Sequence, residues 1–104
     1  MNSPTNQNDQ IDYLMGVSGG TFTIRLLVVQ TTAAAIITIL IDGSSVGTVD
    51  LYHNPNLFNI PLTVTGIAIS QGQHTISFKG ATRNGSSGGW QMAIQSIAIW
   101  RTGA

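Results

Sequence analysis

The sequence predicts an all-β fold, an antiparallel β-sandwich of jelly-roll type with about seven or eight strands. Three observations predict it. Short apolar runs rich in Ile, Val and Thr recur along the chain, clusters of Gly, Asn and Ser separate them, and no long amphipathic helical pattern competes with them. Without a crossover helix, the strands are expected to pair antiparallel. A partly open barrel is the alternative that these patterns leave open.

The chain has 104 residues, a length that suits one domain. Its first ten residues are largely polar, so we expect residues 1–15 to be a flexible N-terminal arm or linker and residues 16–104 to form the β-sandwich. The longest apolar stretch, residues 33–41, is too short for a membrane-spanning helix, so we expect no membrane insertion.

Three strands are expected in the first half of the domain. Thr21–Gln30 begins with alternating apolar and polar residues and ends apolar on both faces, while Ala35–Ile41 is apolar almost throughout. Asp42 and Gly43 then form a strong tight-turn pair, because glycine readily adopts a positive φ. Val46–Tyr52 is the return strand of this hairpin.

The middle of the chain alternates between loops and strands. Residues 53–59 are rich in Asn and Pro and form a loop. The strand that follows contains Pro61, which implies a sheet edge because proline cannot donate a backbone hydrogen bond. We expect a turn at Gln71 and Gly72, and then a strand over residues 74–79 with one face in water.

The last strand follows a glycine-rich loop over residues 80–89. Its apolar residues fall on two different faces if the alternation is strict. A one-residue bulge near Gln95 or Ser96 places them on one face: Trp90, Met92, Ile94, Ile97 and Ile99.

Charge is scarce. Four Lys and Arg balance four Asp and Glu, so the net charge is zero, and charged residues make up 8% of the chain. Nucleic acids and anionic membranes are bound through clusters of cations, so we expect neither as a partner. A surface rich in Thr, Ser, Asn and Gln suits neutral ligands instead.

Catalysis and metal binding are not expected. Glycoside hydrolysis usually needs two facing carboxylates, but Asp9 and Asp12 lie in or beside the arm and Asp42 is explained by its turn. Neither histidine has metal-ligand spacing, no Ser lies in a nucleophile elbow, and the sequence has no cysteine. Asp50 with backbone carbonyls is a weak calcium candidate. We therefore expect a non-enzymatic protein without cofactor or metal.

Two loops offer groups that suit a saccharide. An aromatic ring can stack on a pyranose while Asn, Gln or Asp side chains bind its hydroxyls. The candidate ligand-binding residues are Tyr52, His53, Asn54 and Asn56 in one loop and Arg83, Asn84 and Trp90 in the other. The alternative interpretation is that the aromatic residues anchor the core and the Asn residues serve turns.

Apolar residues are in surplus on the strands of residues 21–41. A sandwich strand needs one buried face, whereas here two are apolar, and monomers avoid leaving such a patch in water. We expect the second face to pack against other subunits of an oligomer. Cover by a loop or by the N-terminal arm is the alternative.

Several segments resemble one family. They are GGTFTIRLLVVQ at residues 19–30, ITILIDGSSVGTVDLYHN at 37–54, VTGIAISQGQHTISFKGATRNGSSGGW at 64–90 and IAIWRTG at 97–103. Together they are similar to the small jelly-roll, carbohydrate-binding-module-like domains near the C-terminal ends of phage tail, fibre and appendage proteins. Related domains are also attached to glycoside hydrolases.

The resemblance implies a binding module of a virion or of an enzyme, often oligomeric when it comes from a fibre, and no particular ligand. On this basis we expect a trimeric module at the tip of a phage tail fibre, located in the virion, that recognises host-surface carbohydrate through several weak sites at once. Two other functions stay open. One is a monomeric, extracellular carbohydrate-binding module of a glycoside hydrolase. The other is a purely structural virion, capsid-decoration or fibre-assembly domain.

Overall fold

The computed structural model describes residues 7–103, which form one antiparallel sheet of five strands. The strands are β1 (Gln10–Gln30), β2 (Ile36–Ile41), β3 (Ser44–Asp50), β4 (Leu57–Thr82) and β5 (Ile94–Gly103), in the order β3-β2-β4-β1-β5. The predicted all-β antiparallel class is confirmed. The predicted number of strands is wrong, because the sheet holds five rather than seven or eight.

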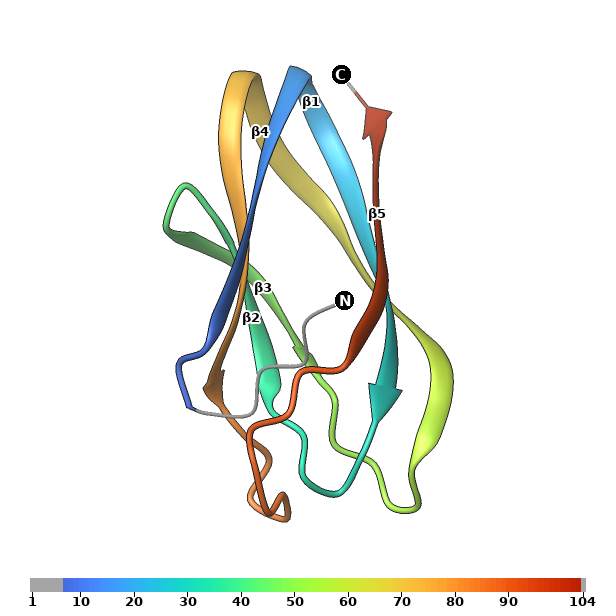
Figure 1. Ribbon diagram of the computed structural model, residues 1–104. Coiled ribbons are helices and arrows are strands. Elements are labelled where there is room, and N and C mark those ends of the chain that lie inside the picture. Colours follow the sequence, from blue (N-terminus) through green and yellow to red (C-terminus); the bar gives the residue numbers. More distant parts are fainter. Residues whose placement is uncertain (1–6, 104) are drawn as a thin grey trace.

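The difference arises in part because β4 contains two of the expected strands, while β1 extends the expected strand Thr21–Gln30 back to Gln10. They pair along nearly their whole lengths, from Gln10 opposite Lys79 to Gln30 opposite Leu57. Both turn over at the same end of the molecule, so that the halves of each strand lie in two facing layers (Figure 1). The turn expected at Gln71 and Gly72 is therefore a bend inside β4, where pairing with β1 continues.

The first strand also begins earlier than expected. Residues 10–15 pair with β4, and Ile11 is buried in the core, so these residues belong to the sheet and not to an arm. Ile11, Tyr13 and Met15 share one face of this strand, while Gln10, Asp12 and the exposed Leu14 lie on the other. Residues 1–6, where the arm was expected to begin, lie outside the described residues.

Other local predictions are confirmed. Asp42 and Gly43 connect β2 and β3 with φ values of 51° and 86°, as a tight hairpin turn requires. The bulge lies at Gln95, because Leu27 is opposite Ser96 while the next residue of β1 is opposite Ile94. Pro61 lies in the part of β4 that pairs with β1 alone, at a sheet edge.

The core lies between the two layers. Inward residues of all the long strands are buried together, among them Ile24, Leu26, Val28, Ile37, Ile39, Ile76, Phe78 and Ile94. The second apolar face is only partly exposed, since Leu27, Val29, Ile36 and Leu40 are half-buried. The loops before β2, before β4 and before β5 gather at the end opposite the two bends (Figure 1).

Candidate functional site

The two loops predicted to bind a ligand lie at this end, and one carboxylate joins them. Asp50 ends β3, and its Oδ1 accepts a hydrogen bond from the Tyr52 backbone N–H at 2.8 Å. Its Oδ2 accepts one from the Asn84 Nδ2 amide at 3.1 Å. The structure thus brings together two clusters that are more than 25 residues apart in sequence. We call this region, residues 50–56 and 83–90, the loop end.

The first loop presents polar side chains to solvent. Asn54 and Asn56 are exposed and make no hydrogen bond within residues 7–103. His53 is held in place, since its Nδ1 donates to the Pro55 carbonyl at 2.7 Å and its backbone N–H donates to the Thr31 carbonyl. Tyr52 is half-buried and forms a backbone bridge with Thr31. The side-chain amides of Asn54 and Asn56 are therefore open to a ligand.

The second loop is fastened to the segment before β2. The Ser87 hydroxyl donates to the Ala34 carbonyl at 2.7 Å, and Gly88 N–H donates to the Thr32 carbonyl at 2.9 Å. Asn84 shapes the turn, because its Oδ1 accepts the Ser86 N–H at 2.9 Å. These anchors give the loop a fixed shape.

Trp90 has an arginine over one face. The Arg83 guanidinium carbon lies 4.8 Å from the ring centroid, a cation-π contact, and the ring packs against the core. Trp90 therefore serves as an anchor, and a sugar that stacked on this ring face would displace Arg83. At the loop end, the Arg83 guanidinium is therefore more accessible to a ligand than the Trp90 indole.

Asp50 was considered in the sequence only as a weak calcium ligand, so its role between the loops was missed. A carboxylate at a strand end, next to a loop rich in Asn, was the available hint. Its partner Asn84 could not be identified without the fold. Within residues 7–103 no group of three or more His, Cys, Asp or Glu side chains could hold a metal ion.

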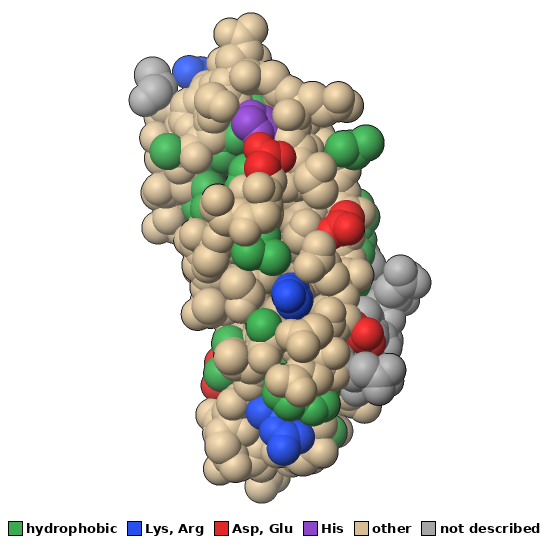
Figure 2. Space-filling model, turned by 90° about the vertical axis from the view of Figure 1, so that its left-hand side faces the viewer, with side chains coloured by type: hydrophobic (Ala, Val, Ile, Leu, Met, Phe, Trp, Pro, Cys, Tyr) green, Lys and Arg blue, Asp and Glu red, His purple; other side chains and the backbone are tan. Residues whose placement is uncertain are grey.

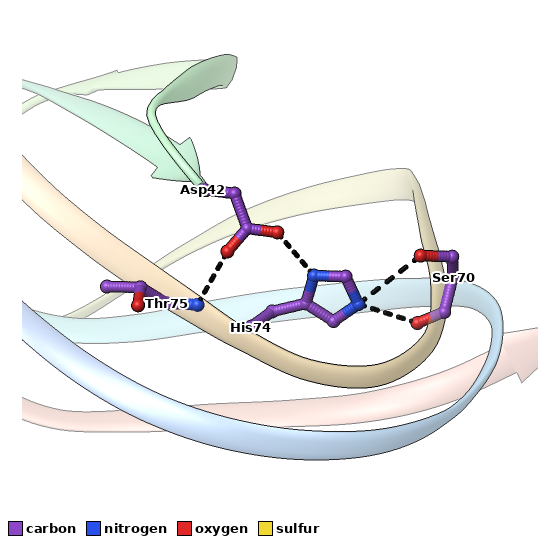
Figure 3. A network of polar contacts seen from close by, with 4 residues as sticks. All are labelled: Asp42, Ser70, His74 and Thr75. Atoms are coloured by element: carbon purple, nitrogen blue, oxygen red, sulfur yellow. Dashed lines mark hydrogen bonds and ion pairs between the residues drawn. The ribbon is translucent and has the colours of Figure 1, made fainter.

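A second polar network lies near the bends (Figure 3). Asp42 Oδ2 is 2.5 Å from His74 Nδ1, and Asp42 Oδ1 accepts the Thr75 backbone N–H at 2.8 Å. On its other side His74 Nε2 is 2.8 Å from the Ser70 carbonyl oxygen and 3.4 Å from the Ser70 hydroxyl. The sequence explained Asp42 by its turn alone and gave His74 no role.

This network has the residue types of a catalytic triad but not the protonation that a triad needs. A general base must keep one ring nitrogen free of a proton. Here both nitrogens of His74 face acceptors, the Asp42 carboxylate and the Ser70 carbonyl, so both donate. The Asp42 hydrogen bond raises the pKa of His74 above its usual value, and the same bond lowers the pKa of Asp42. The network is a structural clasp between the β2–β3 turn and β4.

Residues 7–103 contain no helix long and apolar enough to cross a membrane.

Comparison with known proteins identifies the fold. No protein-family model matches the chain, and no curated protein is similar to it in sequence. Among solved structures, a family 35 carbohydrate-binding module from an environmental isolate is similar, with a TM-score of 0.69 and 23% identity over 94% of this chain and 69% of that one. The fold is that of carbohydrate-binding modules.

Two further structures have the same fold. One is the CBM36-1 domain of a multidomain xylanase from the hindgut metagenome of Trinervitermes trinervoides, with a TM-score of 0.69 and 21% identity over 98% of this chain and 78% of that one. The other is a Paenibacillus xanthan lyase, with a TM-score of 0.72 and 19% identity. There the match covers 95% of this chain but 10% of the enzyme. These structures are binding modules and a polysaccharide lyase, and they give no support to a phage origin.

Proposed function

We propose that the protein is a non-enzymatic carbohydrate-binding module that works as part of a larger, secreted carbohydrate-active enzyme. The observation that supports this most is the likeness of nearly the whole chain to carbohydrate-binding modules of families 35 and 36. The xylanase and the xanthan lyase are large enzymes with such a fold as one part, which favours the enzyme-attached role over the phage-fibre role. In this proposal the fold is a jelly-roll sandwich, with β1 and β4 contributing to both layers.

The proposed ligand site is the loop end. The exposed amides of Asn54 and Asn56 can donate to and accept from sugar hydroxyls, and the Arg83 guanidinium adds donors. Asp50 holds the loops together and so fixes the spacing of these groups before the ligand arrives. Pre-formed loops cost little ordering on binding, which favours a usable affinity from few contacts.

The phage-fibre module is the second candidate. A trimer would have to cover the exposed Phe58 and Trp100. In that case the same loop end would face a host-surface saccharide. A purely structural virion domain needs no ligand at all.

A titration tests the proposed function. We expect xylo-oligosaccharides or xanthan oligosaccharides to shift the amide resonances of residues 52–56 and 83–90 and to change Trp fluorescence. Asn54→Ala with Asn56→Ala should weaken binding about tenfold, because each lost hydrogen bond contributes about 0.5–1.5 kcal/mol. The matched control is Gln71→Ala with Gln73→Ala, two exposed amides near the bends. Absence of any shift with a broad panel of glycans would contradict the proposal.

A further inference from the structure

The outer face of the sheet carries a hollow that the loop end does not use. Strands β1, β2 and β4 lie side by side there, and their register sets outward side chains in rows. One row is Gln10, Lys79 and Thr38, and the next is Asp12, Ser77 and Leu40. The hollow over these rows has a volume of about 570 Å³, within the range of small-molecule sites.

Asp12 is an oriented acceptor at the β1 side of the hollow. Its Oδ1 accepts hydrogen bonds from the Ser77 hydroxyl at 2.6 Å and from the Gln10 amide at 2.7 Å. Both bonds lower the pKa of Asp12, so the carboxylate stays ionised. Its Oδ2 has no hydrogen-bond partner within residues 7–103 and is open to a ligand.

Lys79 supplies the donor. It is the one lysine in the sequence, it is half-buried between its row neighbours, and it has no ion pair or hydrogen bond within the described part of the chain. The Thr38 and Thr75 hydroxyls also line the hollow without a hydrogen-bond partner among those residues. A ligand thus meets an ammonium, a carboxylate and two hydroxyls, while Leu40 and Ala81 supply apolar surface.

The charge of the hollow selects the class of ligand. Lys79 balances Asp12, and the other carboxylate, Asp42, is already hydrogen-bonded to His74 and Thr75. One ammonium beside two carboxylates does not favour a polyanion. Figure 2 shows the face where the C-terminal half of β4 lies in Figure 1. The charged side chains on this face are few and set apart. Fixed donors and acceptors around a small apolar floor suit a neutral, polyhydroxylated ligand.

We propose that this hollow is a second saccharide site, in which hydroxyls of a neutral sugar donate to Asp12 and accept from Lys79. This second site takes its class of ligand, a saccharide, from the proposed function, and it lies outside the loop end. Ala81, which lines the hollow, lies two residues before Arg83 of the loop end. An oligosaccharide can therefore follow β4 from one site toward the other.

The test uses the single lysine as a probe. The full chain, labelled with ¹³C-lysine and ¹⁵N, is titrated with xylohexaose, cellohexaose and mannohexaose. We expect the Lys79 side-chain resonances to shift together with the loop-end amides. A shift of Lys79 alone supports the hollow and overturns the loop end. A shift of the loop end alone overturns the hollow and leaves the proposed function standing, and no shift overturns both.

Two variants give a second measurement. Lys79→Met and Asp12→Asn should each weaken saccharide binding at the hollow by about tenfold or more, since hydrogen bonds to charged groups are the stronger ones. The affinity is measured from the resonances of Lys79 or, in Lys79→Met, of the neighbouring residues. Asn can still accept from Ser77 and Gln10, so the sheet is preserved. Arg25→Met, on the other layer, is the matched control and should leave affinity unchanged. Equal affinity of all three variants and the parent overturns the proposal.

Discussion

His74 donates from both ring nitrogens, to the Asp42 carboxylate and to the Ser70 carbonyl, so the folded protein holds this proton more tightly than the unfolded chain does. The pKa of His74 is raised above 6.5, which means that its contribution to stability is complete below that pH and is lost as pH rises through the raised value. The pKa of Asp42 is lowered below 3.8, so its contribution is lost only as pH falls through the lowered value. The clasp therefore stabilises most between these two ordinary pKa values.

We expect the midpoint of thermal unfolding to fall as pH rises from about 6 to about 8, where an unperturbed histidine would already be neutral. Asp42→Asn should flatten this dependence, and asparagine tolerates the positive φ of that position, so the effect reports the charge. Ser70→Ala removes only the hydroxyl and should keep the dependence, because the carbonyl remains. An equally steep dependence in Asp42→Asn would show that the clasp does not cause it.

At the scale of the element, the bend of β1 depends on Gly20. Its φ is +140°, and a Cβ there would lie 2.5 Å from the Gly103 carbonyl oxygen of β5. Gly20→Ala should lower the free energy of unfolding by about 1–3 kcal/mol, since strained backbone adds to the clash. Gly16→Ala, in the same strand with open space around it, should change it by no more than about 1 kcal/mol. Chemical denaturation of both variants measures the difference, and equal stability would refute this role for Gly20.

The same bends explain which elements could be predicted from the sequence. Alternation located the buried faces, and a change of parity located the bulge at Gln95, because both are local patterns. A glycine pair such as Gly19 and Gly20, or the pair Gln71 and Gly72, has the composition of a turn whether the strand ends or bends. Only the continuing register between β1 and β4 distinguishes the two cases, and it depends on residues about 50 positions apart.

At the scale of the whole molecule, the candidate site could likewise be predicted only in part from the sequence. The polar loop residues could be found from composition, but the contact of Asp50 with Asn84 depends on how β3 and the end of β4 meet. The hollow was missed because its residues, such as Asp12 and Lys79, are far apart in sequence and join only through the strand order. Asp12 was assigned to an arm, although it lies on a sheet face. Sequence patterns thus located single functional groups, whereas topology decided which of them share a site.

The oligomeric state of the whole molecule separates the two candidate functions. The apolar surplus on β1 and β2 favoured an oligomer, and the family resemblance a trimer, yet Leu27 and Leu40 are half-buried by their neighbours. The exposed large apolar side chains among residues 7–103 are spread over three strands, with Tyr13 and Leu14 on β1, Phe58 on β4 and Trp100 on β5. Scattered exposure of this kind is normal for a monomer. We expect sedimentation at micromolar concentration to give one species near 11.0 kDa. A stable species of three times that mass, dissociated by Phe58→Ser or Trp100→Ser, would instead favour the fibre module.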